Sequence, residues 1–176
     1  GQSNCLTADP GHYTGAVDGA ESQFPCGRGT YAPYPGTMFC DDASLGYYVD
    51  TVASTSQTAC AAGTYTDMMG MEYCLDADAG HYVGSTGQSS QTACAVGTYQ
   101  PSTGQSSCTD ASAGHYVDVV GSDEQVPCTE GDYQPLMGQS NCLTADPGHY
   151  TGAVDGAESQ FPCGRGTYAP YPGTMF

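Results

Sequence analysis

The chain has 176 residues, 25 of them glycine and 11 proline, and it lacks tryptophan, isoleucine and lysine altogether. Because large apolar side chains are so scarce, the composition excludes an ordinary globular core, and the ten cysteines must supply stability instead. The net charge of −17 excludes nucleic acid and anionic membrane surfaces as partners, since both attract basic proteins.

The cysteines follow a strict alternation of spacing. Gaps of 14 residues alternate with gaps of 20 or 21, which gives a repeat of 34 residues, once 35. A fixed period of this kind predicts a tandem array. The cysteines form neither CxxC pairs nor a zinc-finger quartet, so we expect disulfides, and disulfides place the chain outside the cell or on its surface. No apolar run is long enough to cross a membrane.

The repeats follow one another without a linker. We expect repeats over 5–39, 40–73, 74–107 and 108–141, while 142–176 starts the next unit. Residues 138–176 reproduce residues 1–39 without a difference, at a shift of 137 residues, or four repeats. The sequence therefore predicts two nested periods and a window onto a longer array.

Each repeat is expected to contain two short hairpins. Residues 97–108 predict strand, turn and strand, because Tyr99 favours a strand and 101–104 supply turn residues. Residues 114–128 predict the same pattern, with a turn near Gly121. No segment has a sustained helical period. The predicted fold class is small, all-β and disulfide-rich: an elongated tandem array of short β-hairpins.

A tyrosine recurs in every half-repeat, two residues after a glycine. A glutamine also recurs, three residues before the second cysteine of each repeat: Gln23, Gln57, Gln91, Gln125 and Gln160. We predict that the tyrosines pack between successive repeats; they are Tyr13, Tyr31, Tyr48, Tyr65, Tyr82, Tyr99, Tyr116, Tyr133, Tyr150 and Tyr168.

The shorter half-repeat has the pattern C-x-x-G-T-Y-x8-C at Cys94 to Cys108, and it recurs three times, with Asp132 replacing threonine once. This pattern resembles the cysteine-rich repeats of the ephrin-receptor-like family and the first module of TNF-receptor cysteine-rich domains. The resemblance implies extended, all-β ectodomains with a ladder of disulfides and no enzymatic activity. The longer half departs from it, because five residues instead of two separate its cysteine from the Gly-x-Tyr motif. Only the architecture is therefore carried over.

Two disulfide pairings remain open. The resemblance implies short loops, with Cys26–Cys40, Cys60–Cys74, Cys94–Cys108 and Cys128–Cys142, and it leaves Cys5 and Cys163 to partners outside the window. The alternative closes the long loops and leaves no cysteine unpaired: Cys5–Cys26, Cys40–Cys60, Cys74–Cys94, Cys108–Cys128 and Cys142–Cys163.

Groups that could carry chemistry are sparse. One histidine stands at the same phase of four repeats, and local acidic pairs occur, but neither pattern gives converging metal ligands or a calcium loop. We therefore predict no enzyme activity, no catalytic residues, no metal site and no cofactor, with Ca²⁺ as a weaker alternative. The residues concerned are His12, His81, His115, His149, Asp41, Asp42, Asp76, Asp78, Asp123 and Glu124.

The sequence favours a structural subunit of an extracellular filament, appendage or surface stalk that self-associates into a fibre. The alternative is a cell-surface adhesin or receptor-like binding module, for which 68–71 and Tyr34-Pro35 are the best patches. Arg28 and Arg165 are candidates for contacts between repeats or chains. Candidate sites for O-linked glycans are Ser54, Thr55, Ser56, Ser102 and Thr103.

Overall fold

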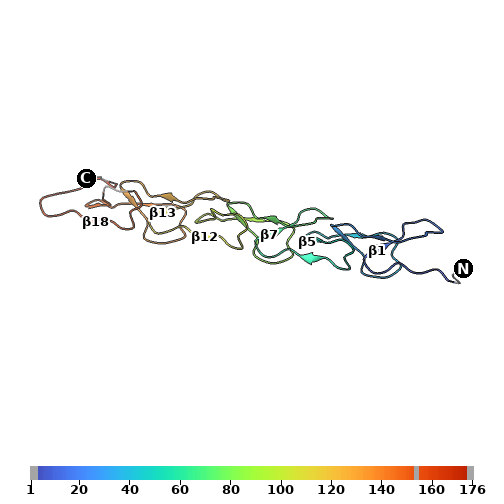
Figure 1. Ribbon diagram of the computed structural model, residues 1–176. Coiled ribbons are helices and arrows are strands. Elements are labelled where there is room, and N and C mark those ends of the chain that lie inside the picture. The colour runs from blue at the N-terminus through green and yellow to red at the C-terminus, as the bar shows by residue number, and fades with distance from the viewer. Residues whose placement is uncertain (1–3, 153–154, 174–176) are drawn as a thin grey trace. The chain divides into compact units, whose positions relative to one another are not determined.

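The computed structural model describes residues 4–152 and 155–173 (Figure 1). In these ranges the chain forms no helix, and eighteen strands of two residues each pair into nine antiparallel hairpins. The hairpins are β1 (His12–Tyr13) with β2 (Phe24–Pro25), β3 (Thr30–Tyr31) with β4 (Asp41–Asp42), β5 (Tyr47–Tyr48) with β6 (Thr58–Ala59), β7 (Thr64–Tyr65) with β8 (Leu75–Asp76), β9 (His81–Tyr82) with β10 (Thr92–Ala93), β11 (Thr98–Tyr99) with β12 (Thr109–Asp110), β13 (His115–Tyr116) with β14 (Val126–Pro127), β15 (Asp132–Tyr133) with β16 (Leu143–Thr144), and β17 (His149–Tyr150) with β18 (Phe161–Pro162).

Each hairpin is introduced by a tight turn that ends in glycine. Gly29 has a φ of 79°, a conformation that residues with a Cβ rarely adopt, and β3 begins at the next residue. The carbonyl of the same glycine closes the hairpin by accepting a hydrogen bond from the amide of Ala43, at 2.8 Å. The first glycine of the Gly-x-Tyr motif thus both opens and closes the hairpin.

The structural unit is half of the 34-residue repeat. Gly29, Gly46, Gly63 and Gly80 are spaced 17 residues apart, and each of them precedes a hairpin. Both halves of the predicted repeat therefore fold in the same way, although only one of them carries the cysteine pattern of the family.

Backbone hydrogen bonds connect each hairpin to the next. The amide of the opening glycine donates to the carbonyl of the residue three positions after the next opening glycine. In one part of the chain these bonds are Gly11 to Ala32, Gly29 to Val49, Gly46 to Thr66 and Gly63 to Val83, and in the other Gly80 to Gln100, Gly97 to Val117, Gly114 to Gln134 and Gly148 to Ala169. Because a single hairpin is only marginally stable in water, these bonds are what allow the array to fold.

The buried residues are small and lie in two columns. One column alternates cysteine with alanine: Ala8, Cys26, Ala43, Cys60, Ala77, Cys94, Ala111, Cys128 and Ala145. The other holds the acceptors of the bonds just described: Ala32, Val49, Thr66, Val83, Gln100, Val117, Gln134, Thr151 and Ala169. The core is thus a thin seam between hairpins, as the scarcity of large apolar side chains requires.

The contacts divide the chain into two compact units. One consists of Gly1–Ala77 with Val83–Gln91, and the other of Asp78–Tyr82 with Thr92–Phe176. Each unit is built only of paired short strands and loops. The predicted fold class, a small all-β, disulfide-rich tandem of hairpins, is confirmed.

Candidate functional site: the stapled hairpins

Four disulfides close the loops of alternate hairpins. They join the cysteines of the short loops, 14 residues apart, with Cα atoms 5.8 Å apart: Cys26–Cys40, Cys60–Cys74, Cys94–Cys108 and Cys128–Cys142. The structure thus contains the short-loop pairing and not the long-loop one. Cys5 is exposed and Cys163 half-buried, and both carry free thiols. We call β3–β4, β7–β8, β11–β12 and β15–β16 the disulfide hairpins.

The other hairpins are fastened by glutamine. The Oε1 atom of Gln57 accepts a hydrogen bond from the backbone amide of Ser44 at 2.6 Å, and its Nε2 donates to the Ser44 hydroxyl at 3.3 Å. Gln23 makes the same pair of bonds to the amide and carboxylate of Asp9. We call β1–β2, β5–β6, β9–β10, β13–β14 and β17–β18 the glutamine hairpins; Gln125 and Gln160 bond the corresponding amides of Ser112 and Asp146.

The two fasteners occupy equivalent places. Cys40 directly precedes the second strand of its hairpin, and Gln57 directly precedes the second strand of the next one. The partner of Cys40 is Cys26, three residues before the opening glycine, and Ala43 stands at that place in the glutamine hairpin. Cys26 and Ala43 are both fully buried. A disulfide and a hydrogen-bonded amide therefore alternate as staples on one backbone scaffold.

The role of this alanine column was not anticipated from the sequence. Alignment on the cysteines makes the two half-repeats look different, because one spacing is 14 residues and the other 20. Alignment on the Gly-x-Tyr motif would have revealed the 17-residue period and the alternation of alanine with cysteine.

Hairpins of the same kind meet through glycines. A Cβ on Gly29 would overlap the carbonyl oxygen of Gly70, which lies in the loop of the next disulfide hairpin. The amide of Gly70 in turn donates to the carbonyl of Ala43 at 2.8 Å. The same contact joins glutamine hairpins, where Gly87 approaches Gly46 and bonds Cys60. Only glycine allows two backbones to approach so closely.

The recurring tyrosines lie on the first strand of each hairpin. They are half-buried, except that Tyr168 is exposed, and they face the second strand of their own hairpin. Tyr13 contacts Phe24 across β1 and β2, with ring centroids 5.8 Å apart. The buried seam is made by smaller residues, so packing of tyrosines between repeats stays a prediction.

Histidines and carboxylates are distributed rather than gathered. Each histidine ring is close to its own backbone; in His115 the Nδ1 atom lies 3.2 Å from the carbonyl oxygen of Ala113. His81, His12 and His149 have the same neighbour two residues earlier. Among the described residues, no group of three or more His, Cys, Asp or Glu side chains is placed to hold a metal ion.

The remaining candidate residues lie at the surface. Arg28 and Arg165 are exposed, as are Thr55, Ser56, Ser102 and Thr103. Ser54 is half-buried, and its hydroxyl donates to the carbonyl of Thr51. Tyr34, Met68 and Met69 are exposed at the loops of two disulfide hairpins. These positions are accessible, and their proposed roles in contacts and glycosylation stay predictions.

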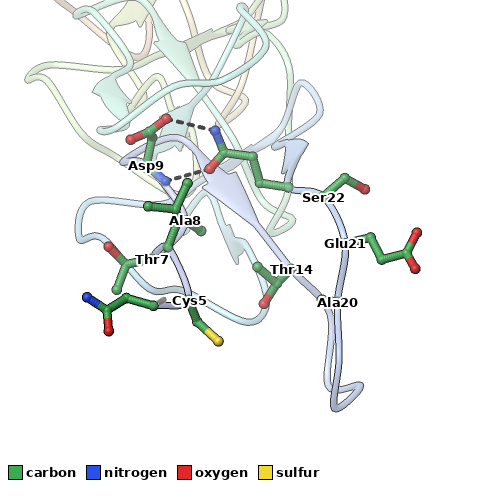
Figure 2. A pocket seen from close by; sticks show the side chains of 11 residues that line it. Cys5, Thr7, Ala8, Asp9, Thr14, Ala20, Glu21 and Ser22 are labelled. Atoms are coloured by element: carbon green, nitrogen blue, oxygen red, sulfur yellow. Dashed lines mark hydrogen bonds between the residues drawn. The ribbon is translucent and has the colours of Figure 1, made fainter. Parts of the chain in front are cut away.

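A groove lies beside the first glutamine hairpin. Its volume is about 900 Å³, and it is lined by residues 4–9, 14 and 20–23. Figure 2 shows the Asp9–Gln23 pair at one end of segment 4–9 and Cys5 at the other. The chemistry of the groove is that of a hairpin surface, with free polar and small apolar groups and no convergent catalytic set.

The comparison with protein families identifies one part of the chain. Residues 80–126 match the family model described as tyrosine-protein kinase ephrin type A/B receptor-like. The chain is a cysteine-rich tandem repeat of this kind. The match covers two glutamine hairpins and the disulfide hairpin between them, and it confirms the resemblance that the cysteine pattern predicts. A comparison with curated proteins finds no match. None of the described residues forms a helix that could span a membrane.

Proposed function

We propose that the chain is a structural segment of an extracellular filament, appendage or surface stalk. The observation that supports this best is the backbone ladder, in which the same glycine amide bonds the next hairpin at 2.7–3.0 Å in both units. A ladder of identical steps transmits load from hairpin to hairpin without a large core. Alternate hairpins are also closed covalently, which restricts the unfolded chain.

The location follows from the chemistry of the staples. Disulfides persist in oxidising surroundings, so a chain that depends on four of them belongs outside the cell or at its surface. The family match points the same way, toward an extracellular receptor-like module. A net charge of −17 keeps such an array hydrated and limits nonspecific clumping.

We further propose that the chain is not an enzyme. Its histidines lie against their own backbone carbonyls, and its glutamines bond backbone amides, so both serve the hairpin geometry. Catalysis needs such groups to converge on a substrate instead.

Electron microscopy of the native material tests the structural role. Long fibres or stalks with an axial period equal to the 137-residue unit are the expected result. Isolated, monodisperse particles in native material would contradict it. Antibody labelling against residues 47–59 identifies the chain within any fibre that is seen.

A receptor-like binding module is the second candidate, because the family match and the exposed loop side chains favour it. Tyr34 is 74% exposed, and Met68 and Met69 are 58% and 62% exposed. If these loops bind a partner, replacing Met68 and Met69 by serine should abolish binding to cell surfaces. The variant Ser102→Ala/Thr103→Ala changes the same loop position of the next disulfide hairpin and is the matched control.

A further inference from the structure

The duplicated sequence supplies an internal control on what each segment can contact. Residues 1–39 and 138–176 are identical, so any difference in exposure between the copies arises from their surroundings. The described parts of the copies differ at two groups of residues. We call them the leading face (Leu6, Gly19, Ala20) and the trailing face (Gly148, Cys163, Tyr168).

The leading face is uncovered where its copy is covered. Leu6 is 83% exposed and Leu143, its copy, 43%. Ala20 is exposed, whereas Ala157 is 7% exposed and its carbonyl accepts a hydrogen bond from the amide of Gln134 at 2.9 Å. Leu6 and Ala20 line the groove shown in Figure 2, which also holds Cys5.

Gly19 gives the clearest difference on the leading face. A Cβ on Gly19 would meet nothing within 4 Å. Its copy, Gly156, covers Gly114 and donates its amide to the carbonyl of Cys128 at 2.8 Å. The loop around Gly19 therefore has the shape of a loop that packs on a glutamine hairpin, but carries none.

The trailing face shows the complementary difference. Gly148 has open space at its Cβ position, whereas Gly11, its copy, is covered by the carbonyl of Ala53. Tyr168 is 78% exposed, while Tyr31, its copy, is half-buried in β3. Cys163 is half-buried, and its copy Cys26 is fully buried.

The two faces match the two sides of a contact that already exists inside the chain. Gly148 and Cys163 hold the places that Gly114 and Cys128 hold in an earlier glutamine hairpin, and those two residues receive Gly156, the copy of Gly19. Tyr133 pairs with Leu143 across β15 and β16. Tyr168 holds the place of Tyr133, and Leu6 is the copy of Leu143.

We propose that copies of this chain join head to tail, with the trailing face of one copy docked on the leading face of the next. Gly19 then donates its amide to the carbonyl of Cys163, as Gly156 does to Cys128, and Leu6 pairs with Tyr168. The contact is heterologous and propagates, so it builds a filament rather than a closed dimer. This inference rests on the proposed function and names the partner: a second copy.

The joint brings the two free thiols together. Cys163 stands where Cys128 stands, and Cys5 is the copy of Cys142, the partner of Cys128. Docking completes a disulfide hairpin from two chains, and an external small disulfide such as oxidised glutathione can then seal it. The two thiols lose two protons and two electrons to form one S–S bond, and the small disulfide is reduced to two thiols.

The test uses the 176-residue chain with its four internal disulfides intact. Equal amounts of ¹⁴N- and ¹⁵N-labelled chain are mixed in 0.15 M salt with oxidised glutathione, and oligomers are separated on non-reducing gels. Pepsin digestion and mass spectrometry then identify the linked peptides. We expect a ladder of oligomers whose mixed-isotope links join Cys5 to Cys163 at least tenfold more often than Cys5 to Cys5 or Cys163 to Cys163.

Two variants keep the test independent of thiol chemistry. Cys5→Ser/Cys163→Ser should still self-associate in sedimentation experiments, and adding Tyr168→Asp should abolish that association. Tyr34→Asp is the matched control, because Tyr34 is equally exposed but lies outside both faces, and it should have no effect. Symmetric and mixed links in equal amounts, or a monomer at every concentration, would overturn the joint. Fibres in native material without this link would leave the proposed structural role standing and reject only the joint.

Discussion

Gly29 combines a left-handed backbone with a close approach to another hairpin. Its φ is 79°, and its α-carbon faces the carbonyl of Gly70. Gly15 has nearly the same φ, 77°, but open space around it. We expect Gly15→Ala to cost about 1–2 kcal/mol, the usual penalty for alanine in this conformation. Gly29→Ala should cost several times more, because the added methyl group must push away the loop at 68–71.

Denaturant unfolding of both variants under non-reducing conditions, followed by far-ultraviolet circular dichroism, measures this difference. Since Gly15→Ala carries the same conformational penalty, the excess loss in Gly29→Ala reports the contact between the two disulfide hairpins. Equal losses in the two variants would show that this contact contributes nothing to stability.

Gln57 holds its hairpin through one side chain. Its Oε1 is the acceptor for the amide of Ser44, which is partly buried. Gln57→Ala leaves that amide without its partner, so we expect a loss of about 1–3 kcal/mol. Hydrogen exchange at the Ser44 amide should accelerate in the variant. Gln105→Ala is the control, because Gln105 bonds only a carbonyl two residues away, and it should leave the exchange of Ser44 unchanged.

At the scale of the element, the equivalence of the two staples makes a direct prediction. Ala43 and Gln57 are 14 residues apart and stand at the places of Cys26 and Cys40. The double substitution Ala43→Cys/Gln57→Cys should therefore form a fifth disulfide and stabilise the chain by about 3 kcal/mol, the amount expected for a loop of this size. Peptide mapping detects the 43–57 link, and unfolding midpoints measured with and without reductant give its contribution.

Ala43→Ser/Gln57→Ser removes the glutamine without adding a covalent bond and controls for the loss of the side-chain hydrogen bonds. If the two new cysteines stay reduced in oxidising buffer, or pair with native cysteines instead, then the glutamine and disulfide hairpins do not share one geometry.

The hairpins themselves could be predicted because turn glycines and strand-forming tyrosines are local signals. Pro101 to Gly104 and the residues near Gly121 mark loops that the structure also contains. The 17-residue unit was not predicted, since disulfide chemistry drew attention to cysteine spacing. Ala43 and Gln57 are ordinary residues on their own, and only the fold shows that they replace Cys26 and Cys40.

The seam between hairpins was also beyond the sequence. Val83 and Val117 are buried because their carbonyls accept the amides of Gly63 and Gly97, so a backbone contact rather than apolar periodicity decides their burial. The abundance of tyrosine suggested that large rings fill this space, whereas the close approach of the backbones leaves room only for small side chains. Contacts between residues far apart in sequence have no local signature.

At the scale of the whole molecule, alternating staples predict a two-stage response to force. In a glutamine hairpin only hydrogen bonds resist extension, whereas a disulfide hairpin keeps the residues between its cysteines out of the extended chain. Fourteen residues could span about 45–50 Å, but the bonded Cα atoms are 5.8 Å apart, so each disulfide withholds roughly 40 Å of length. Single-molecule stretching in oxidising buffer should therefore end about 170 Å short of the fully extended chain, since four such loops stay closed. Adding reductant should release that length in four steps of similar size, while Cys94→Ser/Cys108→Ser should release three. Four steps in this variant, or full extension before reduction, would show that the disulfides do not limit the length of the stretched array.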